Sequence, residues 1–286
     1  MKLTCPGFIR KSRVFILPFF MMTNALSTAA FAERPYQLPE QAAQIAKDVY
    51  LLGIAQHNGK PVIGYSFIHH HHEFAKPEKP GRDKGGRGNG GGKGGGKNKG
   101  STGGGDNTSS CYAFINGGVK WNSAENYIVD PSNQSGMSNS FVYSNIAAAT
   151  TVWNKQVSGN IFGSRISGTV DGADTASPDN KNEVYFAEIN ESGVIAVTNV
   201  WFTYTGVIVE WDQVYDDIDF AWGNADTNTG VMDLLNIAAH EVGHAAGMNH
   251  PDSSCIVETM YAYASAGETR KRDLNAGDIA GIQALY

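Results

Sequence analysis

Cysteine and charge are both scarce in this chain, which has three cysteines in 286 residues and 17% charged residues. Three cysteines allow one disulfide bond at most. The net charge of −6 is mild, so the composition predicts no nucleic-acid partner. No internal repeat is present, and no apolar run after residue 32 is long enough to span a membrane. These absences leave one or two ordinary domains with a hydrophobic core.

Residues 1–32 are predicted to be a signal peptide. Four basic residues from Lys2 to Arg13 precede a short apolar run over residues 14–22, and Ala30-Phe31-Ala32 offers small residues where a signal peptidase cuts. Pro18 breaks the run, which argues against the competing interpretation of an uncleaved membrane anchor. We therefore expect a secreted or periplasmic protein without a membrane span once the signal is removed.

Two segments of contrasting composition follow. Residues 33–75 form a small piece with helical spacing over 39–52 and a strand pattern over 62–68. The histidine run 69–72 follows that strand, and we interpret it as an exposed strand end, with metal binding as the alternative. Residues 76–106 are rich in glycine and lysine and cannot bury enough apolar surface to offset their ordering entropy. They are predicted to be a linker.

From residue 107 to residue 286 the pattern is that of an α+β domain with a mixed sheet. Helices are predicted over 141–157, 232–246 and 275–285, with caps at Ser138 or Asn139, near Asp233 and at Asn275. Strand-like runs, separated by glycine, asparagine and aspartate, cover 119–129, 161–166, 184–189, 194–202 and 207–214.

Export also decides how the cysteines are interpreted. Cys5 lies in the predicted signal, so the exported chain keeps Cys111 and Cys255. Two cysteines in an oxidising compartment most often pair. Closing so long a loop contributes roughly 4–5 kcal/mol in the chain-entropy model. Free thiols, or Cys111 as a ligand that blocks a metal, are the alternatives.

The strongest signal is the run at residues 240–250, which reads HEVGHAAGMNH. Residues four apart share one face of a helix, so His240 and His244 can bind one cation. Gly247 can adopt the left-handed conformation that turns the chain and brings His250 to the same metal. Three histidines leave one tetrahedral position open, as in catalytic zinc sites. Glu241 adjoins the site and can take a proton from a water held there.

Together with Met260, this run resembles the metzincin pattern, in which a methionine turn lies beneath three histidines. Within the metzincins the chain is similar to the matrixins, the matrix metalloproteinase type. Gly247-Met248, His250-Pro251, Thr259-Met260-Tyr261 and the closing segment 278–286 carry that likeness. The resemblance covers roughly Cys111 to Tyr286.

The resemblance implies a twisted mixed sheet with the active helix packed beneath it and a cleft along an edge strand. It also implies a zinc endopeptidase, made as a zymogen with residues 33–75 as its propeptide. The expected partner is a protein or peptide substrate, such as extracellular matrix, and the expected state is a monomer.

Three departures from the matrixin pattern qualify these expectations. The Pro-Arg-Cys-Gly latency motif is absent and Cys111 has a different setting, so we predict that Cys111 pairs with Cys255. Segment 193–197 takes the place of the substrate-pairing edge strand but lacks the histidine that binds a second zinc, so one catalytic zinc is expected. The proline that usually follows Met260-Tyr261 is also missing.

Two further groups of residues are weaker candidates. Asp212, Asp216, Asp217 and Asp219 could bind Ca²⁺, which matrixin-like domains commonly use, but their spacing is irregular and a solvated loop is the competing interpretation. Tyr261 and Tyr263 could stabilise an oxyanion, although their offset from Met260 favours core packing.

Two functions of other classes remain. One is an extracellular zinc-binding adhesion or interaction module without turnover, against which the intact Glu241 argues. The other is a zinc amidase acting on cell-wall peptides, for which the sequence has no wall-binding repeat.

Overall fold

The computed structural model describes residues 1–2, 34–74 and 111–286. The predicted signal peptide beyond residue 2 and the predicted linker therefore lie outside the described residues. Residues 34–74 and 111–286 belong to one compact unit, so the N-terminal piece and the C-terminal body can be described together. None of the helices in these two ranges is both long and apolar enough to cross a membrane.

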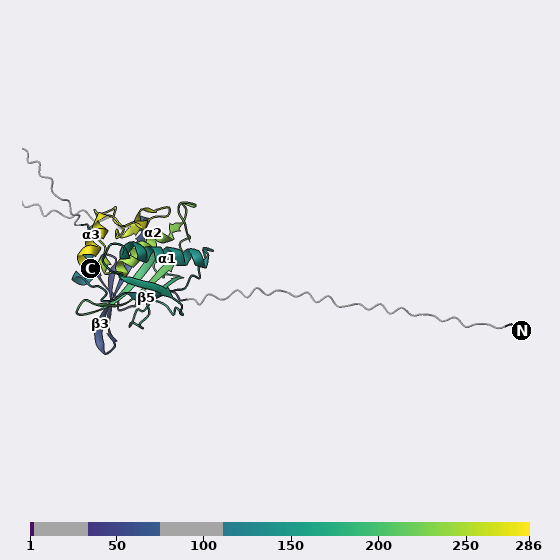
Figure 1. Ribbon diagram of the computed structural model, residues 1–286, viewed down its shortest axis with the longest axis horizontal. Helices are drawn as coiled ribbons and strands as arrows, with labels where there is room; N and C mark the ends of the chain where they lie inside the picture. The colour runs from purple at the N-terminus through teal and green to yellow at the C-terminus, as the bar shows by residue number, and fades with distance from the viewer. Residues whose placement is uncertain (3–33, 75–110) are drawn as a thin grey trace, which may run out of the picture. The chain divides into compact units, whose positions relative to one another are not determined.

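The unit is built on one large mixed sheet, drawn in Figure 1. Its strands lie in the order β1-β2-β3-β8-β9-β7-β5-β6. Their bounds are β1 Ala43–Ala46, β2 Val49–His57, β3 Lys60–His71, β5 Glu125–Val129, β6 Phe162–Ile166, β7 Glu183–Ala187, β8 Val194–Thr203 and β9 Ile208–Asp216. Pairing is parallel from β6 to β9 and antiparallel from β9 to β1.

Short strands complete the described structure. They are β4 Ala113–Phe114, β10 Trp222–Gly223, β11 Met232–Asp233, β12 Met248–Asn249 and β13 Tyr263–Ala264. The pairs β10–β11 and β12–β4 form two small sheets, while β13 adds in parallel to the end of β3.

Three helices accompany the sheet, as predicted: α1 Asn139–Asn154, α2 Leu234–Ala245 and α3 Ala276–Leu285. The side chain of Ser138 caps α1 by accepting from the Phe141 amide, and Asp233 caps α2 through the Asn236 amide. At the start of α3, Asp278 accepts from the Asn275 amide. The α+β class and its three helices are thus confirmed.

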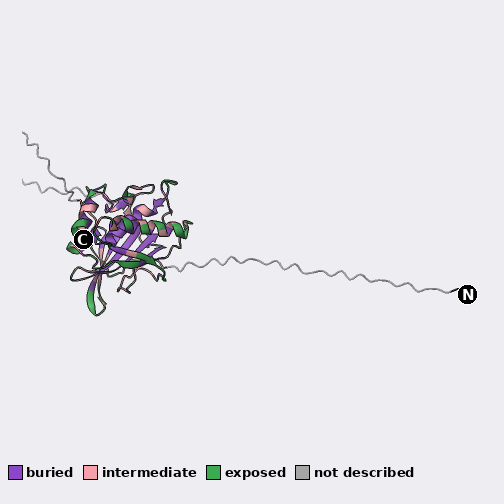
Figure 2. Ribbon diagram, viewed as in Figure 1, coloured by how far each residue is buried: buried purple, intermediate pink, exposed green. Residues whose placement is uncertain are grey.

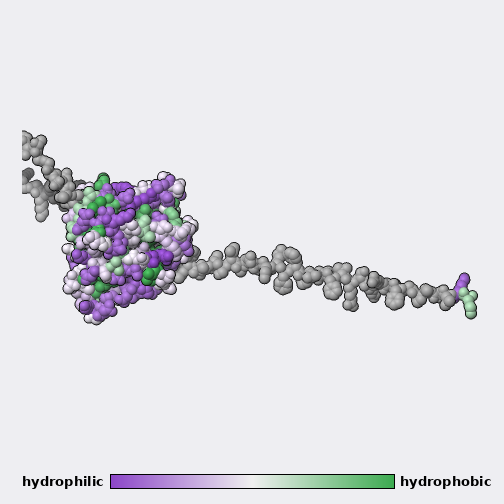
Figure 3. Space-filling view, in the orientation of Figure 1, coloured by the Kyte–Doolittle hydropathy of each residue, from purple (hydrophilic) through white to green (hydrophobic). Residues whose placement is uncertain are grey.

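The main core lies between the sheet and the helices. Figure 1 shows α1 and α2 close to each other over the sheet, and α2 packs on β8 and β9. Trp153, Trp211 and Phe202 are fully buried there. Figure 2 shows the same layering, with buried strands behind helices whose outer sides are exposed. On the face in Figure 3, polar atoms surround small, scattered apolar areas.

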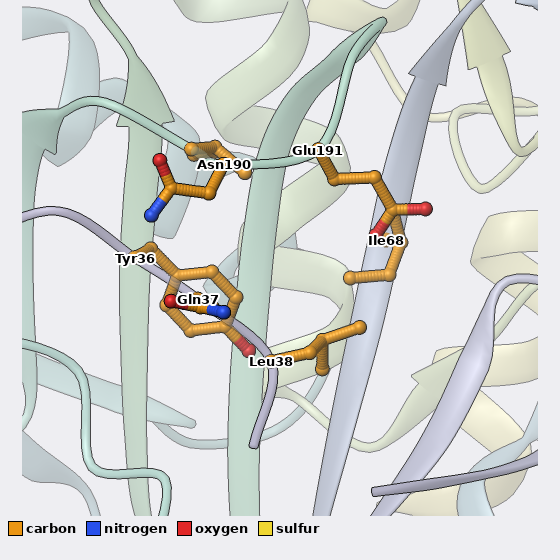
Figure 4. A pocket seen from close by; sticks show the side chains of 7 residues that line it. Tyr36, Gln37, Leu38, Ile68, Asn190 and Glu191 are labelled. Carbon is orange, nitrogen blue, oxygen red and sulfur yellow. The ribbon is translucent and has the colours of Figure 1, made fainter. Parts of the chain in front are cut away.

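The other face of the sheet carries a smaller core that the N-terminal piece helps to cover. Tyr36 packs there with Ile68 and Val197, and its hydroxyl bonds to Ser66 and Asn199. Figure 4 shows the cavity beside it, about 260 Å³ in volume, with Tyr36 and Leu38 facing Ile68 and the 189–191 turn. Because Ile68 and His69 point to opposite faces of β3, this cavity lies away from the histidine site.

One predicted element was wrong, and another was predicted too long. The helix expected over 39–52 is the pair β1–β2, because Asp48 adopts a left-handed backbone (φ 59°) that turns the chain, and β2 finds a partner in β3. The strand expected over 119–129 begins only at Glu125, although Lys120 makes an isolated bridge to Val207.

The predicted edge strand is not an edge. β8 pairs with β9 on one side and with β3 on the other, in register from Val62↔Thr203 to His70↔Val194. The N-terminal piece therefore pairs with the backbone groups that an edge strand would offer to a substrate. In Figures 1 and 2 the far end of the β2–β3 hairpin extends beyond the sheet and is exposed.

The disulfide predicted between Cys111 and Cys255 is present, with a Cα–Cα separation of 5.5 Å. It joins the start of the C-terminal body to the loop that follows His250.

Candidate metal centre

Helix α2 and the turn after it bring three histidines together. His240 and His244 share one face of the helix, and both are fully buried. Gly247 then reverses the chain at φ +98°, where a Cβ would lie 2.1 Å from the Val119 carbonyl oxygen. Only glycine fits this position, so the return of His250 toward the helix depends on it.

The hydrogen bonds of the ring nitrogens prepare this group for a cation. Nδ1 of His240 donates to the Thr259 carbonyl oxygen at 2.7 Å, and Nδ1 of His244 donates to the Met248 carbonyl oxygen at 2.9 Å. Carbonyl oxygens only accept, so each Nδ1 carries the proton and each Nε2 keeps its lone pair. Both Nε2 atoms lie close to Nε2 of His250, at 3.3 and 3.1 Å.

Lone pairs that face one another in a buried site repel unless a cation lies between them. Burial lowers the pKa of His244 to about 3 and the pKa values of His240 and His250 in the same direction. The residues present therefore fit a tetrahedral Zn²⁺ with three imidazole ligands.

Met260 packs against helix α2 at Gly243, beside the histidines. A Cβ on Gly243 would lie 2.2 Å from the Met260 sulfur and 2.6 Å from the Trp153 ring, so the helix can approach the methionine only through glycine. Asp278 in α3 accepts from the backbone amides of Thr259 and Met260, at 2.7 and 3.1 Å. The closing helix thus positions the turn whose Thr259 carbonyl orients His240.

Glu241 is fully buried beside the three histidines. Thr198 in β8 donates its hydroxyl to Oε2 at 2.6 Å, and His69 in β3 lies 2.8 Å from Oε1 through its Nδ1. Burial raises the pKa of Glu241 to about 8, against the lowering effect of Thr198. A carboxylate of this kind can hold and release a proton near neutral pH.

The side chain that faces Glu241 belongs to β3. In β3, Phe67 and His69 both point toward α2: the Phe67 ring stacks on His244 at 4.4 Å, and the His69 ring lies 3.9 Å from that of His240. His69 is 1% exposed, so its predicted position at an exposed strand end was wrong. The rest of the run becomes more exposed along the chain, and His72 is exposed as predicted.

Lys271 extends this contact into the C-terminal body. Its Nζ lies 3.1 Å from Nε2 of His69 and also donates to the Tyr261 carbonyl oxygen. Lys271 is fully buried, and burial lowers its pKa to about 7. A buried chain of polar groups thus runs from Lys271 through His69 and Glu241 to Thr198. Neither Lys271 nor Thr198 carried a local sequence signal.

A cavity of about 250 Å³ lies on the other side of His250. Its walls come from the β1–β2 turn, the loop after His250 and the segment 261–263. Tyr263 is buried and Tyr261 half-buried in this wall, which agrees with the packing role predicted for them.

The four predicted calcium ligands are not brought together. Asp216 accepts from the backbone amides of Ile189, Ile218 and Asp219, and Asp217 accepts from Gln134. Asp212 accepts from the backbone amides of Asp174 and Glu183. Among the described residues, Asp216, Asp217 and Asp219 belong to no group with metal-ligand spacing.

Comparison with known proteins agrees with this geometry. A model of the matrixin family matches residues 116–286. Metalloendoproteinase 2-MMP of Arabidopsis thaliana is 43% identical over 58 residues, which are 20% of this chain and 15% of that protein. Matrix metalloproteinase-19 of Mus musculus is 42% identical over 79 residues, 28% of this chain and 14% of that protein. Matrix metalloproteinase-16 of Homo sapiens is 37% identical over 71 residues. The similarity thus spans a small part of these relatives.

Proposed function

Because the chain belongs to the matrixin family, whose members are zinc-dependent peptidases, we propose that it is a secreted zinc endopeptidase with Glu241 as its general base. His240, His244 and His250 are the proposed ligands. The observation that carries the proposal is the convergence of three Nε2 atoms beside a buried carboxylate, two of them left unprotonated by the hydrogen bonds of their Nδ1 atoms. One catalytic zinc accounts for these residues.

When bound, zinc lowers the pKa of a water toward about 7 and polarises the scissile carbonyl. Residues of the chain transfer the proton and orient the reacting groups. Glu241 takes the proton of the attacking water through Oε1 and passes it to the leaving amine. Thr198 holds Oε2, which keeps Oε1 pointed into the site. The Thr259 and Met248 carbonyl oxygens keep the two helix histidines in the orientation that zinc requires.

The substrate is proposed to be an extended peptide that takes the place of β3. That strand runs antiparallel to β8 from Val62 to His70, and at its end, at His70 and His71, it also runs parallel to β13. It therefore marks a path along which β8 can pair with the backbone of a peptide. The cavity beside His250 opens next to this path and would receive a side chain of the substrate. The natural substrate is a protein or peptide outside the cell.

Residues 33–75 are proposed to act as the propeptide. β3 fills the substrate path, Phe67 covers His244, and His69 engages the general base. The site is therefore closed by a histidine on a strand, in a chain that lacks the matrixin latency cysteine. Cutting within 76–106 would release the segment and open the cleft.

One observation favours a second candidate function. The proposed substrate path is filled by β3, a strand of the same chain whose residues 66–69 are each 1% exposed or less. If that strand never leaves, the molecule is a zinc-binding interaction module without turnover.

An engineered cleavage site within 76–106 separates the two candidates. After cutting and removal of the N-terminal segment, a zinc-loaded peptidase hydrolyses a mixture of unstructured peptides, and both a chelator and Glu241→Ala stop it. Turnover that survives both treatments contradicts the proposed chemistry. Zinc bound without turnover, after the segment has gone, supports the module.

A further inference from the structure

A pocket in the C-terminal body receives the side chain of His69. This residue lies opposite Ala196 in the pairing of β3 with β8, and it is 1% exposed. Its ring contacts Glu241 through Nδ1 and Lys271 through Nε2, at 2.8 and 3.1 Å. The space that the ring occupies is named the His69 pocket. It differs from the cavity beside His250, which neither Glu241 nor Lys271 lines.

The two ring nitrogens of His69 have different roles. A lysine side chain donates hydrogen bonds, so Nε2 of His69 accepts from Lys271. The proton of the neutral ring then lies on Nδ1, which donates to Oε1 of Glu241. On the side of Lys271 the pocket therefore presents a donor, and the side chain that fills it in this structure supplies an acceptor.

The C-terminal body holds Lys271 without help from the N-terminal piece. The backbone amide of Lys271 donates to Oδ1 of Asn236 at 2.7 Å, and its Nζ also donates to the Tyr261 carbonyl oxygen. The next residue, Arg272, pairs with Asp233 at the start of α2. All of these partners remain when β3 leaves, so the donor is positioned before a substrate arrives.

A second donor lies next to Lys271. Asn236 precedes His240 by one turn of α2, on the same face of the helix, and it is 1% exposed. Its Nδ2 is buried and has no hydrogen-bond partner. A buried donor of this kind is satisfied when a ligand brings an acceptor. Asn236 thus adds to the donor character that Lys271 gives this part of the body.

The length of the His69 side chain indicates which substrate residue can replace it. An apolar side chain in the pocket would bury the Lys271 amine against carbon, which is unfavourable. The amide oxygen of glutamine lies the same number of bonds from Cα as Nε2 of histidine, so it can accept from Lys271 in the same way. A glutamate would reach as far, but its charge would be repelled by the carboxylate of Glu241.

We propose that Lys271 selects peptide substrates that place a glutamine in the His69 pocket. The inference rests on the proposed function, because it concerns a peptide that takes the place of β3. In that register the glutamine lies opposite Ala196 and beside Glu241, the proposed general base. It therefore flanks the bond that is cut. Lys271 is a specificity-determining residue in this account, and Asn236 supports it.

The first test measures hydrolysis by the cut, zinc-loaded chain after the N-terminal segment has been removed. Mass spectrometry of a digested mixture of unstructured peptides gives the residues on both sides of each cut bond. Matched peptides then carry glutamine, methionine or glutamate at the flanking position that shows the preference. Methionine is nearly as long as glutamine and has no strong acceptor. We expect kcat/KM for the glutamine peptide to be the highest of the three and about 10-fold or more above that for methionine.

Variants then assign the preference to a residue. Lys271→Met removes the donor, so the ratio of kcat/KM for the glutamine and methionine peptides should fall to about 1 or below. Lys155→Met, at an exposed lysine that follows α1, is the matched control and should leave the ratio as in the parent.

A second measurement does not depend on hydrolysis or on the folding of a Lys271 variant. In the uncut chain carrying Glu241→Ala, His69→Gln keeps an acceptor for Lys271, whereas His69→Leu does not. The melting temperature of the glutamine variant should be higher by at least about 2 °C. The same two replacements at His72, which is exposed, should differ by less.

The outcomes separate this inference from the proposed function. Peptide hydrolysis with equal rates for glutamine and methionine, or with a glutamine preference that survives Lys271→Met, overturns the inference and leaves the peptidase in place. A melting temperature of His69→Leu equal to or above that of His69→Gln also overturns it. No hydrolysis of any peptide contradicts the proposed function instead, and the melting temperatures then still decide whether the pocket takes an acceptor.

Discussion

The histidines of the C-terminal body and His69 of the N-terminal piece differ in how far their roles can be predicted from nearby sequence. His240, His244 and His250 lie within eleven residues, and their spacing on one helix and one turn predicts a metal site. His69 lies 172 residues before Glu241, the group it contacts, and nothing near it in the sequence predicts that contact. Local spacing thus predicts the proposed metal ligands, whereas the contact between His69 and Glu241 depends on long-range strand pairing.

The largest expected effect concerns the general base. Glu241→Ala should lower kcat/KM of the cut chain by about 10³-fold or more, because among the described residues no other carboxylate is grouped with the three histidines. Zinc content, measured by atomic absorption, should stay near that of the parent. Glu188→Ala, an exposed glutamate, is the control, and equal losses in both variants would contradict the assignment.

The next effect tests the N-terminal histidine. In the uncut chain, His69→Ala removes the contact with Glu241 and should raise residual peptide hydrolysis by about 10-fold. A loss of about 1.4 kcal/mol in the docking of β3 is enough for that change. His72→Ala, at the exposed end of the same run, should not change the rate. Hydrolysis that rises equally in both variants would show that His69 has no special part in closing the site.

A third effect tests the packing of Met260 against helix α2, which carries His240 and His244. Gly243→Ala places a methyl group 2.2 Å from the Met260 sulfur, so we expect a loss of about 1–3 kcal/mol in the free energy of unfolding. Urea denaturation measures it. Gly230→Ala, on an exposed turn, should cost less, and the opposite ranking would show that Met260 does not support the helix.

The smallest effect is a change in pH dependence. The pKa of Lys271 falls from 10.5 to about 7 in the folded chain. Between these values the unfolded chain binds a proton that the folded chain does not, so rising pH favours the folded state. Lys271 therefore contributes a gain of about 1 kcal/mol per pH unit above pH 7. Lys271→Met should remove this part of the slope in denaturation curves between pH 7 and 9, and an unchanged slope would contradict the burial of a neutral lysine.

Much of the fold was predictable from sequence because its signals are local. The caps at Ser138, Asp233 and Asn275 and the turn at Gly247 identify the helices and the histidine turn without tertiary information. The two cysteines of the C-terminal body leave one possible bond, and it is present.

The remaining features depend on contacts between distant segments. The spacing of apolar residues over 39–52 fits a helix. In the structure the chain turns at Asp48, and the residues after the turn pair with β3 as strand β2. The calcium site predicted at residues 212–219 rested only on the closeness of four aspartates in the sequence. Alternation along β9 instead places Asp212 beside Glu210, under a loop that comes from elsewhere in the chain.

The central claim is that β3 closes a working zinc site, and one paired measurement tests it most directly. Peptide hydrolysis is measured before and after cutting within 76–106 and removing the N-terminal segment, with zinc content measured in both samples. The account predicts equal zinc content and a rate that rises at least about 100-fold on removal of β3, because the strand and the substrate compete for β8. Equal rates in the two samples, at equal zinc content, would contradict it.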